Sequence, residues 1–194
     1  MNQNMLNDEM LIEDAANGQT KAAVLRKEII SWIKVIVFAV LAAYLINNFV
    51  LVNAAVPTGS MENTIMTGDR IVALRLSYMF SEPERFDIIV HKFPDDGETL
   101  FIKRIIGLPG DVVEVIDGRV FLNGESEPLE EPFVRDVPHG NSGPFTIPEN
   151  SFFVMGDNRN SSSDSREWVN RFVHRDQILG RALFGYFPRP KLLR

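Results

Sequence analysis

The segment from Ile29 to Val52 is almost wholly apolar, and this feature limits the possible folds more than any other in the sequence. Its cleaner part, from Val35 onward, would extend roughly 27 Å as a helix at ~1.5 Å per residue. A bilayer core is about 30 Å thick, so the segment can cross it with a modest tilt. Lys34 is tolerable near one end, because its stem can carry the charge to the interface. We therefore predict a transmembrane anchor over residues 29–52.

Two other interpretations of this segment are possible. A chain of 194 residues rarely buries so long and uniformly apolar a helix in its core. A cleaved signal peptide is also conceivable, because Val52-Asn53-Ala54 places small residues at a plausible cleavage site. The apolar run exceeds a signal-peptide core of roughly 7–15 residues, which favours a retained anchor.

The distribution of basic residues predicts the orientation of the anchor. Four basic residues lie on its N-terminal side, namely Lys21, Arg26, Lys27 and Lys34. On the other side the first is Arg70. The positive-inside rule then places residues 1–28 in the cytoplasm and residues 53–194 outside the cell membrane. The polar, acidic start of the chain is expected to be a mobile tail.

After residue 52 the pattern changes to short runs with a period of two, separated by Gly, Pro, Asn and Asp. Asp117-Gly118 predicts a tight hairpin turn, because both residues tolerate positive φ. The predicted strands are Arg70–Leu76, Phe86–Phe93, Leu100–Leu108, Val112–Ile116, Arg119–Leu122, Ser151–Met155 and Gln177–Phe187. Residues 164–175 are expected to hold a short helix or a turn. The pattern indicates a mainly β fold, an antiparallel sheet coiled into a barrel or sandwich.

Residues 124–148 contain five prolines and several acids. Because proline removes a backbone donor, we expect a loop-rich excursion from the sheet. A surface insertion without a part in the chemistry is the favoured interpretation of this excursion.

Composition excludes several classes of function. The net charge of −6 argues against nucleic-acid binding, which requires a basic face. The chain has no cysteine, so it has no disulfide, thiolate metal site or cysteine nucleophile. Its His and acidic residues show no metal-ligand spacing, and we expect neither a metal nor a cofactor.

Pro57-Thr58-Gly59-Ser60-Met61 follows the anchor closely and has the composition of an exposed tight turn. A serine hydroxyl becomes a nucleophile only when a neighbouring base takes its proton. The Ser60 N–H and the Thr58 hydroxyl are suitable donors for an oxyanion hole. Taken alone, a Gly-Ser turn is more often only a turn.

Lys103 is the candidate base, because the three histidines lie in separate, unremarkable contexts. On a strand it would share one face with Phe101 and Ile105. A lysine that acts as a base near neutral pH needs its pKa lowered by roughly 3 units, which burial can supply at about 4 kcal/mol. The alternative is an edge-strand lysine that points into water.

Residues 156–166 form a third polar segment, Gly-Asp-Asn-Arg-Asn-Ser-Ser-Ser-Asp-Ser-Arg. Such a run is typical of a solvated loop, yet it follows the apolar strand predicted at 151–155. If buried, Asp164 and Arg166 would need partners and form an obvious pair. The serine hydroxyls could orient a neutral lysine.

Together these segments resemble the bacterial type I signal peptidases, membrane-bound serine proteases that remove signal peptides from exported proteins. The resemblance covers the anchor and nearly all of residues 52–188. The segments that carry it are Pro57–Met61, Arg70, Arg85–Val90, Lys103–Asp111, Gly156–Ser162 and Asp164–Arg166.

The resemblance implies a role for each matching residue. Ser60 would be the nucleophile and Lys103 the general base, with an oxyanion hole formed by the Ser60 N–H and Thr58. Ser162 would orient the Lys103 amine. The other implied groups are the site-bracing residues Arg104, Asp157, Asp164 and Arg166, and the substrate-pocket residues Met61, Phe101 and Ile102. The expected partners are preproteins with A-x-A-like cleavage sites and membrane lipid, without nucleic acid.

The sequence departs from the family pattern at two positions. Asn63 stands where members often have proline, and Thr58 stands where some carry serine. A related Ser/Lys processing peptidase with a different target remains an alternative, as does a catalytically inactive, membrane-tethered binding module. A self-cleaving repressor would also share the dyad, but the anchor leaves no room for its DNA-binding domain.

Overall fold

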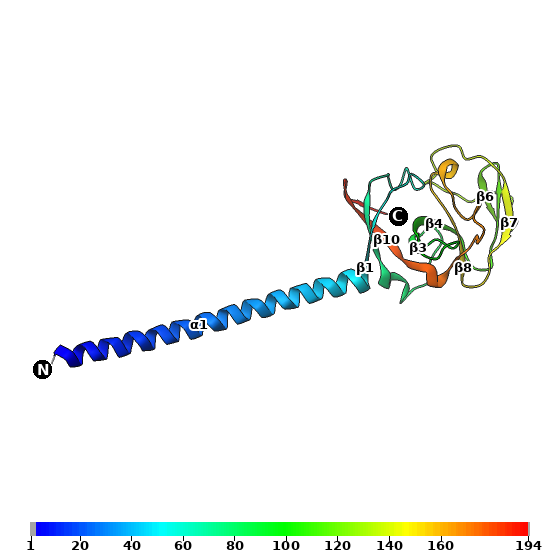
Figure 1. The fold of residues 1–194 in the computed structure, drawn as a ribbon. Coiled ribbons are helices and arrows are strands. Elements are labelled where there is room, and N and C mark those ends of the chain that lie inside the picture. The colour runs from blue at the N-terminus through cyan, green and yellow to red at the C-terminus, as the bar shows by residue number, and fades with distance from the viewer. Residues whose placement is uncertain (1–2, 194) are drawn as a thin grey trace. The chain divides into compact units, whose positions relative to one another are not determined.

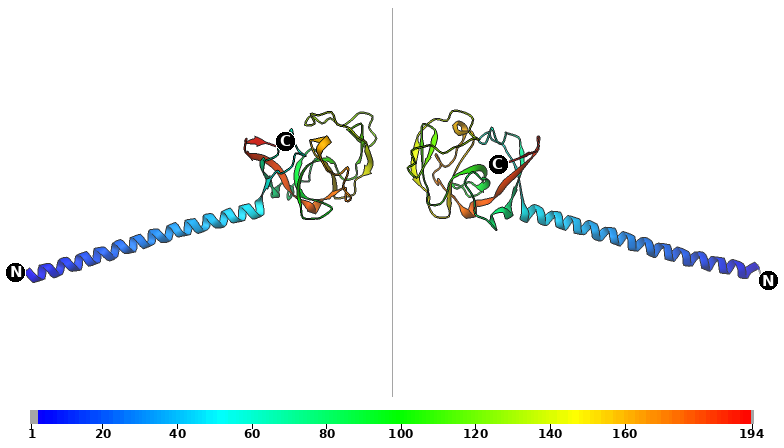
Figure 2. Two further views of the ribbon diagram at one scale, coloured as in Figure 1. Left: turned by 45° about the horizontal axis from the view of Figure 1, so that its top comes forward. Right: turned by 180° about the vertical axis from the view of Figure 1, so that it is seen from behind.

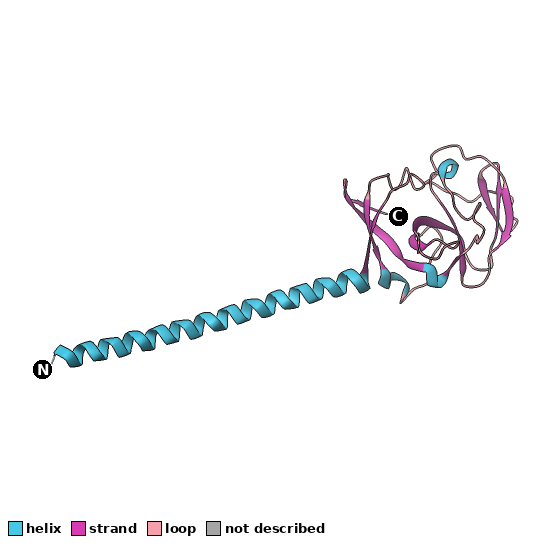
Figure 3. Ribbon diagram, in the orientation of Figure 1, coloured by secondary structure: helices cyan, strands magenta, loops and turns pink. Residues whose placement is uncertain are grey.

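The computed structural model describes the backbone of residues 3–193 and the side chains of residues 24–193. It separates into two compact units, Met1–Ile46 and Asn47–Arg194. The first unit is helical, whereas strands dominate the second (Figure 3).

Helix α1 runs from Gln3 to Leu45 and continues as a π-helical turn, Ile46–Val50. Its part from Val24 to Val50 has a mean hydropathy of 2.4 and is long and apolar enough to cross a membrane. The tail expected at residues 1–28 is therefore helical from Gln3 on. Most of this segment consists of good helix formers such as Ala, Leu, Met, Glu and Lys, which explains the difference.

The helical part ends before the anchor boundary that we expected at Val52. Leu51 and Val52 instead begin strand β1 (Leu51–Ala55), which pairs antiparallel with β2 (Arg70–Leu74). Val52 lies opposite Ala73 and is 5% exposed. Burial in the sheet core, with paired backbone groups, outweighs the apolar continuity that suggested a longer anchor.

Eight strands form the main antiparallel sheet, in the order β1-β2-β10-β3-β4-β8-β9, with β11 paired to β10. The strands not yet described are β3 (Ile88–Lys92), β4 (Leu100–Gly107), β8 (Ser151–Met155), β9 (Val173–His174), β10 (Ile178–Phe187) and β11 (Lys191–Leu192). Register shifts interrupt the pairing of β10 with both β2 and β3. Such bulges bend a strand, and the sheet accordingly coils (Figure 1). The mainly β, coiled antiparallel fold expected from the sequence is confirmed.

A second sheet of three strands, β6-β5-β7, lies at the opposite end of this unit from β1, β2 and β11 (Figure 2). Strands β5 (Val112–Ile116) and β6 (Arg119–Leu122) form the predicted hairpin, in which Asp117 and Gly118 have φ values of 49° and 77°. The third strand, β7 (Ser142–Thr146), was not predicted, because it lies in the proline-rich excursion. It is an edge strand, where proline is tolerated.

Strand β4 positions the candidate base, because it contacts all three hydrophobic clusters of the core. Ile102 packs against the first cluster, Phe101 and Ile105 against the second, and Ile106 belongs to the third. Lys103 therefore projects from a strand that packs against all three clusters of the core.

Candidate active site

Ser60 lies in the turn-rich connection between β1 and β2. The backbone N–H of Glu62 donates to Gly59 O (3.0 Å), and that of Ile65 donates to Met61 O (2.7 Å). Asn63, in the same connection, has a φ of 83°. Proline fixes φ near −65°, so the turn as built requires a residue that tolerates the left-handed region, such as asparagine. These bonds hold Ser60 at one side of a cavity.

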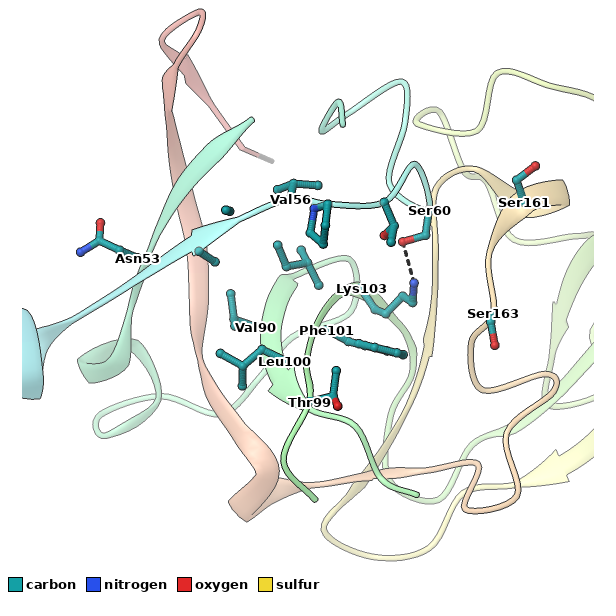
Figure 4. Close-up of a pocket in the computed structure, with 15 residues that line it drawn as sticks. Asn53, Val56, Ser60, Val90, Thr99, Leu100, Phe101, Lys103, Ser161 and Ser163 are labelled. Atoms are coloured by element: carbon teal, nitrogen blue, oxygen red, sulfur yellow. Dashed lines mark hydrogen bonds between the residues drawn. The ribbon is translucent and has the colours of Figure 1, made fainter. Parts of the chain in front are cut away.

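Lys103 and Ser60, 43 residues apart, meet in this structure. Lys103 Nζ donates a hydrogen bond to Ser60 Oγ at 2.7 Å (Figure 4). The Lys103 side chain extends from β4 beside the ring of Phe101, whose centroid is 5.5 Å from Nζ. Lys103 is only 3% exposed, which contradicts the alternative of an edge-strand lysine in water.

Burial lowers the pKa of Lys103 to about 8. The carboxylates of Asp164 and Asp157 act in the opposite direction and raise this pKa, whereas the Arg166 guanidinium lowers it. The net effect leaves a useful fraction of the amine neutral at slightly alkaline pH. An amine in that state can accept a proton from an adjacent hydroxyl.

The loop from Gly156 to Arg166 packs against the Ser60 turn. The backbone N–H of Asn158 donates to Ser60 O, and its side-chain Nδ2 donates to Gly59 O, both at 3.1 Å. A Cβ added to Gly156 would lie 2.3 Å from both Ser60 O and Ser162 Oγ. Only glycine at position 156 therefore allows this close approach of the loop to the turn.

Two ion pairs, one buried and one partly buried, join the residues that we expected to brace the site. Arg104 binds Asp157 through two bonds, Nε to Oδ1 at 2.8 Å and Nη2 to Oδ2 at 2.7 Å. Arg166 binds Asp164 in the same way, at 2.8 and 2.9 Å. The two parallel hydrogen bonds in each pair offset the free-energy cost of removing the charges from water. That these pairs serve catalysis remains a prediction.

Ser162, the residue expected to orient the lysine, is 6% exposed and lies beside Gly156. Its Oγ has no hydrogen-bond partner among the described residues. The expected bond to the Lys103 amine is thus not formed in this structure, and the orienting role of Ser162 stays a prediction.

A cavity of about 550 Å³ opens beside the Ser60–Lys103 pair. It is bordered by β1, the Ser60 turn, β4 and two serines of the loop, Ser161 and Ser163 (Figure 4). Thr58, which we assigned to the oxyanion hole, lines it together with Ser60.

Two of the three expected pocket residues, Phe101 and Ile102, line this cavity. Met61 does not. It is 1% exposed and lies in the first core cluster with Val56 and Val90, which do form part of the cavity wall. The hydrophobic side chain of Met61 is drawn into the core, so it supports the wall from behind.

None of the three histidines forms a hydrogen bond with Ser60 in the described part of the chain. His91 is fully buried, and burial lowers its pKa to about 4, so its ring is neutral at physiological pH. His139 and His174 are exposed. Between residues 24 and 193, the structure groups no three His, Asp or Glu side chains in an arrangement that could hold a metal ion.

Sequence reasoning missed the partner of Arg159, a fully buried side chain in the 156–166 loop. Its guanidinium binds the carboxylate of Glu131, in the proline-rich excursion. Nothing in the sequence links these residues, because they lie 28 positions apart in segments without periodicity. The available signal was Arg159 itself, because an arginine in a loop that packs closely on the protein needs an acidic partner.

Comparisons with known proteins agree with the resemblance seen in the sequence. The family model described as signal peptidase, peptidase S26, matches residues 29–187. A signal peptidase I of Leptolyngbya laminosa is 41% identical over 168 residues, which cover 82% of this chain and 80% of that protein. The probable signal peptidase I-2 of Synechocystis sp. is 40% identical over 165 residues, covering 82% and 73%.

Other bacteria supply further relatives. The signal peptidase I S of Bacillus subtilis is 35% identical over 174 residues, covering 84% of this chain and 91% of that protein. A crystal structure of a signal peptidase I from Enterococcus faecalis is 33% identical, with a TM-score of 0.43, and covers 52% of this chain and 97% of that one.

Proposed function

Because this chain belongs to the signal peptidase family, peptidase S26, and is therefore a serine endopeptidase, we propose that it removes signal peptides from exported preproteins by cutting after small residues. Ser60 is the nucleophile in this proposal and Lys103 the general base. The observation that carries it is the 2.7 Å hydrogen bond from the Lys103 amine to Ser60 Oγ, within an almost fully buried environment.

The reaction begins with neutral Lys103. Its amine takes the proton of Ser60 Oγ as the oxygen attacks the scissile carbonyl carbon, giving a tetrahedral intermediate and an ammonium. The Ser60 N–H and the Thr58 hydroxyl stabilise the oxyanion. Lys103 then returns the proton to the leaving amine, and the peptide bond breaks to leave an acyl-Ser60 ester. Lys103 next takes a proton from a water as that water attacks the ester carbonyl, and it then returns this proton to Ser60 Oγ as the acyl bond breaks.

The strand edges beside the cavity support an extended peptide as the substrate. Within the described residues 3–193, strand β1 pairs only with β2, so its other edge has no partner strand there. Leu100–Lys103 of β4 pair with β3 but not with β8. Both segments line the cavity. Free strand edges bind an extended chain through its backbone, and side pockets select alternate side chains. The apolar wall formed by residues such as Val90 and Ile102 suits small apolar side chains before the cut.

The apolar helix and the bacterial relatives fit a membrane-anchored enzyme. We further propose that residues 1–28 lie in the cytoplasm, that the anchor follows, and that the catalytic unit lies on the extracytoplasmic face. The basic residues before the anchor support this orientation. A signal peptide that emerges from the same bilayer would then present its cleavage site to the enzyme from the lipid.

The test is cleavage of a purified preprotein with an A-x-A site by the detergent-solubilised full chain. We expect a single new N-terminus directly after that site, identified by N-terminal sequencing or mass spectrometry, with a Ser60→Ala preparation as the blank. Cleavage of the preprotein at another position would favour a related processing peptidase. If neither cleavage nor acylation of Ser60 by a lactam inhibitor occurs, the chain is a binding module and the proposal fails.

The lowered pKa of Lys103 predicts the pH dependence of this cleavage. Since only the neutral amine acts as a base, kcat/KM, which reports pKa values of the free enzyme, should be low at pH 6 and rise about tenfold per pH unit until it levels off above pH 8. Initial rates at substrate concentrations well below KM, from pH 5.5 to 9.5, give the midpoint. A flat profile between pH 6 and 9 would contradict a lysine base.

A further inference from the structure

The proline-rich excursion, whose favoured interpretation was a surface insertion, sends two side chains into the protein beside the candidate site. The Glu131 carboxylate accepts hydrogen bonds from both terminal nitrogens of Arg159, the Nη1 bond being 2.7 Å. Arg159 is 0% exposed and the Glu131 side chain 9%. This glutamate is therefore the counter-charge of a guanidinium that has no access to solvent.

Phe133 lies between the two buried arginines that flank the site. Its ring centroid is 4.0 Å from Cζ of Arg104 and 5.9 Å from Cζ of Arg159. The ring also contacts Phe86 edge-on, with 5.4 Å between centroids. A ring face at such a distance attracts a guanidinium and fixes its plane. We call Glu131 and Phe133 together the excursion clasp.

The excursion clasp is connected to Ser60 and Lys103 through the contacts of Arg159. Arg159 Nε donates to Gly156 O at 3.1 Å, and Arg159 O accepts a bond from Arg166 Nη2 at 2.8 Å. Gly156 in turn touches both the Ser60 carbonyl and Ser162 Oγ. A displacement of Arg159 would therefore move both ends of the loop that packs on the Ser60 turn.

Further contacts hold the excursion to the same loop. Asn160 Nδ2 donates to Val137 O at 3.0 Å, and Asn160 Oδ1 accepts from the His139 N–H at 3.2 Å. The excursion and the loop are thus joined at three residues of the excursion, 131, 137 and 139, in addition to the ring of Phe133.

We propose that Glu131 and Phe133 are positioning residues, which hold the 156–166 loop against Ser60 and keep water away from Lys103. The proposal rests on the Ser60–Lys103 mechanism proposed above. The charged groups that act on Lys103 are Asp164, Arg166 and Asp157 of the loop. His91, on the neighbouring strand β3, also interacts with Lys103 but is neutral at physiological pH. Glu131 does not act directly on the pKa of Lys103, although its charge raises the pKa of Arg166. We assign its influence on Lys103 to the position of the loop.

The test compares Glu131→Gln with Glu130→Gln in the detergent-solubilised full chain. Glu130 is the adjacent, exposed acid, so both variants lose one negative charge from the same segment. We expect Glu131→Gln to lower kcat at least tenfold with KM changed less than threefold, whereas Glu130→Gln stays within twofold of the parent. The midpoint of the pH profile should move upward by half a unit or more in Glu131→Gln, because water that reaches Lys103 returns its pKa toward that of free lysine.

A second pair of variants covers the case in which Glu131→Gln does not fold. Phe133→Leu keeps an apolar side chain of smaller volume but loses the ring face, and Phe133→Tyr keeps the ring. We expect the leucine variant to lose at least fivefold in kcat with the same upward shift of the pH midpoint, and the tyrosine variant to match the parent.

The outcomes separate this inference from the proposed function. Loss of activity in step with the folded fraction measured by circular dichroism, with an unchanged pH midpoint, would show a merely structural role and overturn the inference. Full activity of Glu131→Gln and Phe133→Leu, with Ser60→Ala inactive, would overturn it as well and leave the mechanism intact. Activity that survives Ser60→Ala would instead refute the mechanism itself.

Discussion

The Lys103→Met variant is expected to lose about four orders of magnitude in kcat for preprotein cleavage. Methionine has a similar length but cannot accept a proton, so Ser60 would keep its hydroxyl proton at every accessible pH. Removal of a general base or of the nucleophile that it activates costs on the order of 10³–10⁶ in enzymes in which the two act as a unit. The measurement is single-turnover cleavage with excess enzyme, which detects slow reactions.

Two companion variants make this prediction specific. Ser60→Ala should lose as much, and the double variant should lose no more than either single one, because neither group works without the other. Lys92→Met removes an exposed lysine from the neighbouring strand β3 and serves as the matched control, with activity unchanged. Additive losses in the double variant would mean that Lys103 and Ser60 act independently.

The second large effect is expected on stability, from Asp157→Ala. Asp157 is 0% exposed at its side chain and pairs with Arg104, which is 1% exposed. Removal of one partner of a buried pair leaves an uncompensated charge and costs about 3–5 kcal/mol. Asp157 also accepts a hydrogen bond from Thr64 Oγ1, which joins the pair to the Ser60 turn.

This loss should appear as a fall in melting temperature of about 10 °C, since 1 kcal/mol corresponds to roughly 2–4 °C in a domain of this size. Thermal unfolding followed by circular dichroism in detergent measures it, with the exposed Asp136→Ala as control. A shift below about 2 °C would show that the Arg104 guanidinium finds another partner or water. In that case the pair would not stabilise the site.

The strands were predictable because they follow local rules. Alternation and β-branched residues predicted seven of the strands within about two residues, and Asp117-Gly118 predicted the hairpin between β5 and β6. Strand β1 was not predicted, because Leu51 and Val52 are as apolar as the helix before them. Only pairing with β2 distinguishes them, and pairing between distant segments leaves no local mark in the sequence.

In the site, too, the features set by local sequence could be predicted, whereas those set by contacts between distant segments could not. Ser60 and Lys103 were found through the chemistry of their residue types, and the structure places them in hydrogen-bonding contact. The partnership of Glu131 with Arg159 depends on how a proline-rich segment folds back over the sheet, which no periodicity encodes. The burial of Met61 behind the cavity wall likewise depends on packing, which its proximity to Ser60 in the sequence does not reveal. Its part in the substrate pocket stays a prediction.

The buried amine of Lys103 also connects the enzyme's stability to proton binding. An unfolded chain holds the proton of this lysine up to about pH 10.5, whereas the folded chain releases it near pH 8. Between these values the unfolded state binds more protons, so the stability of the fold rises with pH. Below pH 8 the buried charge of Lys103 lowers the free energy of unfolding by its full amount, about 3 kcal/mol at 1.36 kcal/mol per pKa unit. At neutral pH, a chain selected for stability alone would therefore favour an apolar residue at position 103, and only selection for activity can keep the lysine there.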